Sequence, residues 1–342
     1  MRLLPRWNPP NPWASTEVEW LEPPPEAPLQ IFEEDARSIL SKNDSPDVPF
    51  RWSLNPYRGC VHGCAYCYAR PTHQYLGFGA GSDFERKIVV KRNAPALLRA
   101  AFDKGAWQGE SISFSGNTDC YQPVEASFRL TRRCLELCLE YRNPAHVITK
   151  SALVRRDAAL LAELARVAGA GVTVSIPFAD EAMARAIEPQ ASAPSARFET
   201  LRVLAEAGVP VAVNVAPVIP GLNDSQVVEV LERAAAAGAT GAGIQAVRLP
   251  AEVLPVFFER LSRAYPQRAA KVESAIRQVR DGKLDVAEFG ARMSGAGPRW
   301  QAIERLFQVH RARLGLDGDE ERAVARASTF RRPRAQGELF GE

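Results

Sequence analysis

The sequence predicts an α/β fold, a partial (β/α)6 TIM-like barrel of parallel strands. Short apolar segments alternate with helical segments of about ten to fifteen residues, and strands joined in this way pair in parallel through right-handed crossovers. Six such units can be followed along the chain, which is too few for a closed barrel of eight. In barrels of this kind the chemistry lies at the carboxyl ends of the strands, so the loops that follow the strands are the candidate site.

The composition is that of a soluble globular protein. The chain has 342 residues, of which 46% are hydrophobic and 24% are charged, enough for one large domain or two ordinary ones. Its first residues lack the apolar core of a signal peptide, and no apolar run approaches the length of a membrane span. Six cysteines, three of them in one loop, do not suggest a secreted disulfide framework. We therefore expect a cytoplasmic protein with no membrane partner.

Three regions are expected along the chain. Residues 1–50 are rich in proline and predict an extended N-terminal arm, with a short helix near Glu33–Leu40. Residues 51–265 carry the barrel, and residues 266–342 predict a helical C-terminal extension with a basic tail. This extension holds 15 Lys or Arg against 11 Asp or Glu, while the net charge of the whole chain is +3. Such an excess can meet nucleic-acid phosphates, but a solvated helical surface shows the same pattern.

The expected strands are short apolar segments followed by turn residues. They are Trp52–Leu54, Ser111–Phe114, His146–Thr149, Val172–Ile176, Val211–Val218 and Gly243–Val247. A further extended segment is expected at Lys87–Lys91.

The connecting helices have apolar residues at helical spacing and several end at glycine. They are expected at Ala94–Asp103, Val124–Tyr141, Arg155–Ala168, Phe198–Ala207, Ser225–Ala237 and Val253–Ala264. Asp224 is the expected N-cap of the fifth helix. Cys134 and Cys138 fall four residues apart on the second helix, where small apolar side chains pack in a core.

The loop Asn55–His73 holds three cysteines at C-x3-C-x2-C spacing, Cys60, Cys64 and Cys67. A zinc site normally wants a fourth protein ligand, and neither His62 nor His73 falls at a finger-like offset. A cubane iron–sulfur cluster usually takes four thiolates, so three thiolates would leave one iron without a protein ligand. An open metal position is a place where a small molecule can bind and react.

The string NPYRGCVHGCAYCYARPTH resembles the radical S-adenosylmethionine superfamily, in the branch related to spore photoproduct lyase. The resemblance implies that Cys60, Cys64 and Cys67 hold a [4Fe–4S] cluster whose fourth iron chelates the amino and carboxylate groups of S-adenosylmethionine. It also implies that Tyr66 lies against the adenine, and it agrees with the partial barrel. The structural alternative for the three cysteines is a zinc knuckle or unrelated thiols.

The resemblance implies further contacts to S-adenosylmethionine at the ends of later strands. The turn Ser115–Asp119 occupies the place of the family's glycine-rich motif but reads SGNTD, so its glycine-glycine-glutamate form is absent. The expected cofactor-binding residues outside the cysteine loop are Ser115, Asn117, Lys150, Ser175 and Asn214. For each of them the structural alternative is a polar residue that only caps a turn. Glu188 and Arg197 are further candidates to line the mouth of the barrel.

Cys120 follows this turn, and spore photoproduct lyase uses a cysteine in this region as a hydrogen-atom donor. The resemblance therefore makes Cys120 the candidate catalytic residue, although related members carry proline at the same place.

The expected activity is that of a radical enzyme, lyase-like or modifying. It would cleave S-adenosylmethionine with an electron from a donor such as flavodoxin or ferredoxin, and the 5′-deoxyadenosyl radical would abstract hydrogen from a substrate in the barrel. A nucleic-acid lesion is one candidate substrate, and RNA, a peptide or a small metabolite is another. The alternative from a different class is a non-catalytic iron–sulfur or zinc protein in electron transfer or binding.

Overall fold

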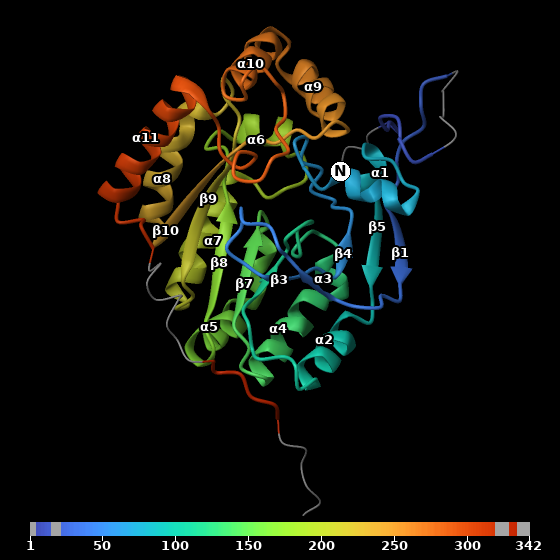
Figure 1. The fold of residues 1–342 in the computed structure, drawn as a ribbon, viewed down its shortest axis with the longest axis vertical. Coiled ribbons are helices and arrows are strands. Elements are labelled where there is room, and N and C mark those ends of the chain that lie inside the picture. The colour runs from blue at the N-terminus through green and yellow to red at the C-terminus, as the bar shows by residue number, and fades with distance from the viewer. Residues whose placement is uncertain (1–4, 15–21, 319–327, 334–342) are drawn as a thin grey trace, which may run out of the picture.

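The centre of the protein is a seven-stranded sheet with the strand order β10-β9-β8-β7-β6-β3-β2 (Figure 1). The computed structural model describes residues 5–14, 22–318 and 328–333. The strands are β2 (Leu40–Lys42), β3 (Trp52–Leu54), β6 (Ile112–Phe114), β7 (Ala145–Thr149), β8 (Ala170–Ser175), β9 (Val211–Val218) and β10 (Gly241–Ala246). All neighbours from β3 to β10 pair in parallel, and only β2 is antiparallel, to β3. The six parallel strands confirm the predicted fold class.

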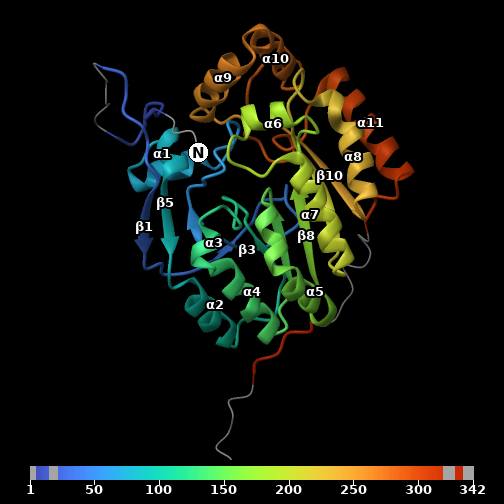
Figure 2. The same cartoon turned by 180° about the vertical axis from the view of Figure 1, so that it is seen from behind.

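Helices between these strands cover one face of the sheet, as the two opposite views show (Figures 1 and 2). They are α2 (Ala94–Asp103), α4 (Leu130–Glu140), α5 (Ala158–Val167), α7 (Pro194–Glu206) and α8 (Val227–Ala236). Two short helices, α3 (Glu125–Phe128) and α6 (Glu181–Ile187), complete the connections, and α6 lies above the sheet beside α9 (Val253–Ala264). The largest core cluster lies between sheet and helices and includes Cys134 and Cys138, both fully buried as expected. No helix in the described part of the chain is long and apolar enough to cross a membrane.

The predicted helix Val124–Tyr141 is wrong in one respect, because the chain breaks at Arg129 into α3 and α4. Arg129 has a left-handed backbone with φ of 53°. The buried carboxylate of Glu125 turns back and accepts the backbone N–H groups of Thr131 (3.0 Å) and Arg132 (3.2 Å). These are N–H groups at the start of α4 that no helical carbonyl can satisfy, so the break is capped by a side chain.

The helix predicted near Glu33–Leu40 is also wrong. The segment begins in the last two residues of β1 (Gln30–Glu34) and ends at the first residue of β2. Strand β1 pairs in parallel with β5 (Lys87–Lys91) in a second, three-stranded sheet of order β1-β5-β4. The third strand is β4 (Tyr57–Arg58), at the start of the cysteine loop. This second sheet therefore joins the N-terminal region to the loop that carries the three cysteines.

Asp224 does not cap the helix predicted to follow it. A 3-10 turn, η3 (Asp224–Gln226), precedes α8, and the Asp224 carboxylate instead accepts a hydrogen bond from Arg299 at 2.8 Å. Arg299 belongs to α11 (Gly297–Arg313), so the carboxylate links the barrel to the C-terminal helices. Two longer 3-10 segments, η1 (Arg70–Leu76) and η2 (Ala152–Asp157), were not predicted either.

The described part of the basic tail packs against the amino ends of the strands. Residues 328–333 lie at the bottom of Figure 1, below α5 and α2, whereas α9 (Val253–Ala264) and α10 (Pro266–Gln278) lie at the top. Phe330 contacts the ring of Phe102 with centroids 5.7 Å apart. Arg332 donates hydrogen bonds to the carbonyls of Phe102, Lys104 and Trp107 at 2.6–3.0 Å. This arginine therefore binds the chain's own backbone.

Arg280 ties the C-terminal segment to the end of β10. Its side chain is buried, with 2% exposed, and lies between the two segments. It donates hydrogen bonds to the carbonyls of Val247 (2.6 Å), Ala291 (3.0 Å), Arg292 (3.1 Å) and Ser294 (2.5 Å). Since buried carbonyls need partners, one guanidinium satisfies the backbone on both sides of this junction.

We predict that Arg280→Met lowers the free energy of unfolding by about 3 kcal/mol, because four backbone carbonyls, including that of the buried Val247, lose charge-assisted hydrogen bonds. Urea denaturation measures the change. Arg277→Met, in the last turn of α10, is the control three residues earlier, where an exposed ion pair with Glu273 is worth less than about 1 kcal/mol. Equal losses in the two variants would contradict the role of Arg280.

Candidate active site

A cavity of about 230 Å³ opens at the carboxyl ends of the parallel strands. Its wall combines the cysteine loop with residues in or directly after β6, β7, β8, β9 and β10. It brings together every metal-binding and cofactor-binding residue predicted from the sequence, namely Cys60, Cys64, Tyr66, Cys67, Ser115, Asn117, Lys150, Ser175 and Asn214.

The three cysteines are held on a loop that has almost no regular secondary structure. Cys60, Cys64 and Cys67 are not in disulfides, and all three line the cavity. Gly59 and Gly63 have φ of 74° and 65°, a backbone conformation that costs glycine little. A Cβ at Gly63 would lie 2.9 Å from the Glu85 carboxylate, so only glycine fits there.

Buried charged side chains bind the backbone carbonyls on one side of this loop. Arg70 is fully buried and donates hydrogen bonds to the carbonyls of Cys64 (2.8 Å) and Gly63 (3.2 Å). Its charge is balanced by Glu85, at 2.5 Å, and Glu85 also pairs with Arg260 of α9 at 2.9 Å. Burial alone would raise the pKa of Glu85, but the two arginines outweigh it and hold the pKa below its usual value. The loop is thus clamped to α9 through a charged triad.

Gln122 holds the other side of the loop. Its side chain accepts the Val61 N–H at 2.9 Å and donates to the Gly59 carbonyl at 2.9 Å. Gln122 is fully buried and follows β6, so the first barrel loop is fixed to the second. The amide satisfies one donor and one acceptor of a backbone that has no strand partner there.

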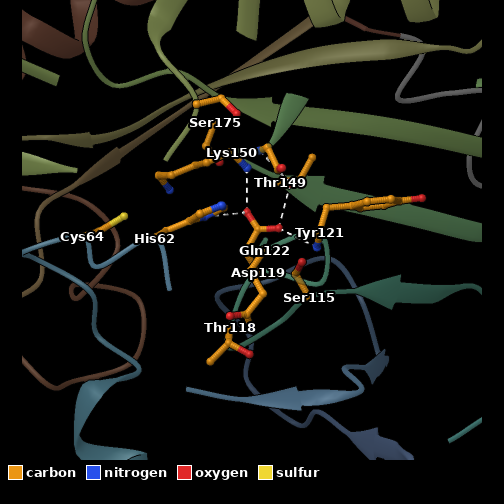
Figure 3. Close-up of polar contacts among 12 residues, drawn as sticks. His62, Cys64, Ser115, Thr118, Asp119, Tyr121, Gln122, Thr149, Lys150 and Ser175 are labelled. Atoms are coloured by element: carbon orange, nitrogen blue, oxygen red, sulfur yellow. Dashed lines mark hydrogen bonds and ion pairs between the residues drawn. The ribbon is translucent and has the colours of Figure 1, made fainter. Parts of the chain in front are cut away.

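Asp119 connects three parts of the cavity wall (Figure 3). One carboxylate oxygen accepts the Thr149 hydroxyl (2.8 Å) and the Tyr121 N–H (2.8 Å), and the other accepts the Lys150 N–H (2.7 Å). The second oxygen also lies 3.4 Å from Nδ1 of His62, between two of the cysteines. Burial lowers the pKa of His62, and Asp119 opposes this effect. Asp119 therefore sets the position of the Lys150 backbone relative to the cysteine loop.

Tyr66 is anchored from behind by a buried ion pair. Its hydroxyl bonds to the Glu188 carboxylate, which in turn pairs with Arg197 at 2.5 Å. Arg197 also donates to the Ser175 carbonyl at 3.0 Å. Burial, and then the Glu188 charge, raise the pKa of Tyr66 well above its usual value. Glu188 and Arg197 do not line the cavity, contrary to expectation, and instead support Tyr66 and Ser175 from beneath.

The remaining predicted cofactor-binding residues differ in whether their side chains already have a partner within the protein. The Lys150 ammonium lies 5.8 Å from the Tyr66 ring centroid, and no described carboxylate pairs with it. Ser115 donates its hydroxyl to the Ile148 carbonyl at 2.6 Å and accepts the Cys120 N–H, so this hydroxyl is already used within the protein. Ser175 and Asn214 line the cavity without such internal side-chain bonds among the described residues.

The structure does not support the expected role of Cys120. Its side chain is fully buried in the main core and does not line the cavity. The turn before it explains this position, because Ser115 adopts a left-handed backbone with φ of 104° and its hydroxyl accepts the Cys120 N–H at 3.2 Å. The chain therefore turns inward before it reaches the cysteine.

Several cavity residues were not predicted. Gln245 lies near the end of β10, the last parallel strand, Arg248 follows that strand, and Met293 comes from the C-terminal region. The strand-end rule that predicted Lys150 would also have found Gln245 and Arg248. The position of Met293 depends on contacts across the Arg280 junction, for which the sequence carries no local signal.

The residues present fit a three-cysteine iron–sulfur cluster. Burial raises the pKa of the Cys64 thiol to about 12 and also raises the pKa of Cys60 and Cys67, so bound iron would displace protons from these thiols. No three described His, Cys, Asp or Glu side chains surround a single-ion site. The thiolates of a cubane cluster each bind a different iron, so they need not converge as the ligands of one ion do.

A family model for the radical SAM superfamily matches residues 54–234. An uncharacterized protein of Mycobacterium tuberculosis is 36% identical over 245 residues, which are 71% of this chain and 72% of that protein. An uncharacterized protein of Methanocaldococcus jannaschii is 30% identical over 196 residues, 57% of this chain and 70% of that protein. The chain belongs to the radical SAM superfamily, as the cysteine loop indicated.

The fold has a counterpart among solved structures. Spore photoproduct lyase complexed with dinucleoside spore photoproduct superposes with a TM-score of 0.57, over 83% of this chain and 79% of that chain. The sequence identity is 16%, so the likeness is one of fold. It confirms the resemblance to spore photoproduct lyase at the level of architecture.

We predict that Glu85→Gln destabilises the protein at neutral pH and that the loss disappears in acid. The folded-state pKa of Glu85 is lowered, so its contribution is complete above the unfolded pKa of about 4.5 and is lost as pH falls through the folded pKa. Urea midpoints between pH 7 and pH 3 test this, and the wild-type and variant curves should converge at the acid end. Glu259→Gln, in an exposed pair on α9, is the control and should follow the wild type throughout.

Proposed function

We propose that the protein is a radical SAM enzyme in which Cys60, Cys64 and Cys67 hold a [4Fe–4S] cluster. The observation that carries this proposal is the convergence of the three thiols with Lys150, Ser175 and Asn214 on one cavity. When bound and reduced by a partner such as flavodoxin or ferredoxin, the cluster supplies the electron that cleaves S-adenosylmethionine to methionine and a 5′-deoxyadenosyl radical. That radical would abstract hydrogen from a substrate held in the same cavity.

In this proposal the chain's own residues bind and orient the cosubstrate. The Lys150 ammonium faces the cavity without a described carboxylate partner, so it suits the carboxylate or ribose of S-adenosylmethionine. Tyr66, fixed by Glu188, offers an aromatic edge to the adenine, and Asn214 offers a side-chain amide. Asp119 keeps Lys150 in register with the cysteine loop through its backbone N–H.

The alternative is a non-catalytic iron–sulfur or zinc protein, and it makes a different prediction about S-adenosylmethionine. Dithionite-reduced protein releases 5′-deoxyadenosine if it is a radical enzyme and does not if it only transfers electrons or binds metal. Lys150 and the cysteine loop line the same cavity. This arrangement favours the enzyme, because electron transfer alone needs no cosubstrate pocket.

A nucleic-acid lesion is the candidate substrate suggested by the fold of spore photoproduct lyase. The basic tail adds less support than its composition suggested, because Arg332 is bound to backbone carbonyls at the end of the barrel opposite the cavity. Salt-sensitive binding of damaged DNA would favour this substrate over RNA, a peptide or a small metabolite, since phosphate contacts release counterions.

We predict that anaerobic reconstitution loads about four iron atoms per chain, and that Cys64→Ala sharply lowers the iron content and abolishes 5′-deoxyadenosine release. Iron and sulfide assays and chromatography of the products measure both effects. Cys138→Ala, which removes a buried thiol far from the cavity, is the control for general loss of thiols. Iron content in Cys64→Ala equal to that of the wild type would overturn the proposal.

We predict that Lys150→Met weakens S-adenosylmethionine binding about tenfold or more, the worth of one charge-assisted contact, while iron loading stays normal. Calorimetric titration of the reconstituted protein measures the affinity. Lys271→Met, on the exposed surface of α10, should bind like the wild type. An unchanged affinity in Lys150→Met would remove Lys150 from the binding site.

A further inference from the structure

The end of β10 carries an arginine that the proposed reaction does not use. Val247 and Leu249 are fully buried in the cluster beneath α9, whereas Arg248, between them, lines the cavity. The register of β10 against β9 shifts between Ile244 and Ala246, as in a β-bulge. Bulges of this kind redirect side chains next to functional sites, and here Gln245, within the bulge, also lines the cavity.

The backbone on both sides of Arg248 is fixed. The Val247 N–H donates to the Val218 carbonyl at 3.0 Å, and the Val247 carbonyl accepts from Arg280 at 2.6 Å. The Leu249 N–H donates to the Asp285 carboxylate at 3.1 Å. Arg248 is therefore held on a rigid strand end, which is how a binding residue keeps its position before a ligand arrives.

The guanidinium of Arg248 lacks an ionic partner in the described part of the chain. Its Nε is buried and makes no hydrogen bond, and no described carboxylate lies within ion-pairing distance. Arg292, a charge of the same sign that acts on Arg248, is itself paired with Asp47. The guanidinium lies over the ring of Tyr68, with 5.6 Å between its carbon and the ring centroid. Burial, followed by the charge of Arg292, lowers the pKa of Arg248.

An unsatisfied buried donor costs about 1–3 kcal/mol, more for a charged group, so this arrangement favours a ligand that supplies the missing acceptor. A guanidinium offers donors in a planar fork that matches two oxygens of a carboxylate or phosphate. Lys150, the other cavity cation without a described partner, follows β7 and lies beside Tyr66 of the cysteine loop. Strands β8 and β9 separate the two positions in the sheet. The two unpaired cations therefore approach the cysteine loop from different strands, Lys150 over Tyr66 and Arg248 over Tyr68.

We propose that Arg248 anchors the substrate, and that the substrate carries an oxyanion, a carboxylate or a phosphate, which Arg248 binds through its planar fork of donors. The inference rests on the proposed function, since it assigns S-adenosylmethionine to the side of Lys150 and the substrate to the side of β10. Tyr68 and Met293 form the apolar wall next to this anchor, and Gln245 provides a neutral amide beside it.

The competing assignment is that Arg248 binds the carboxylate of S-adenosylmethionine itself. The two assignments differ in one measurable quantity, the affinity for S-adenosylmethionine, because only the competing one requires it to fall when the arginine is removed.

The experiment compares the wild type, Arg248→Gln and Arg166→Gln as reconstituted proteins saturated with S-adenosylmethionine. Inorganic phosphate and succinate are the probes, titrated separately at fixed ionic strength by calorimetry. We expect one probe to bind the wild type and Arg166→Gln alike and to bind Arg248→Gln about tenfold or more weakly. The probe that shows this difference identifies the oxyanion as a phosphate or a carboxylate. Arg166 is an exposed residue of α5 and controls for the loss of one positive charge.

Three outcomes overturn the inference: neither probe binds the wild type, Arg248→Gln binds the probe as the wild type does, or Arg248→Gln loses affinity for S-adenosylmethionine. Iron content and S-adenosylmethionine affinity of the wild type test the proposed function separately. If the wild type fails to load iron, titration of the probes into the cluster-free protein still decides whether Arg248 binds an oxyanion.

Discussion

The backbone of the cysteine loop depends on side chains for the hydrogen bonds that strands and helices make for themselves. Its buried carbonyls accept hydrogen bonds from Arg70 and Gln122, and Glu85 balances the charge of the buried Arg70. Unpaired buried backbone groups are costly, so this support is what allows an irregular loop to exist inside the protein. The rest of the cavity is arranged around that loop, since β6 contributes Gln122 and α9 contributes Arg260.

The strand ends act together because one carboxylate connects them. Asp119 bonds to the residues that close β7 and lies beside His62 in the cysteine loop, so the positions of three loops are coupled through a single side chain. Behind Tyr66 the Glu188–Arg197 pair has the same effect for β8. A cavity assembled from several strand ends and loops thereby gains rigidity, which radical chemistry requires because a reactive species must meet one atom and no other.

The periodicity of the sequence predicted all six parallel strands. For the helices α2 and α9 the predicted bounds are also the observed ones. It failed where a long-range contact overrides local preference: Glu125 breaks a continuous helical pattern at Arg129, and pairing with β5 makes β1 a strand. The residues of the candidate site likewise fall into those that were predicted correctly and those that were not. Residues at strand ends, such as Lys150 and Ser175, follow from topology, whereas Cys120 was misplaced because one left-handed residue, Ser115, turns the chain into the core.

The binding of Arg332 to backbone carbonyls has a consequence for the order in which the protein folds. Its contact with the Phe102 carbonyl joins residues 230 positions apart, across the amino ends of the strands. A ribosome releases the chain from its first residue onwards, so helix α2 and the strands emerge well before their last partner does. The aromatic cluster of Phe102, Tyr141 and Phe330 is therefore completed only after the barrel has been synthesised, which makes this contact a late step in folding.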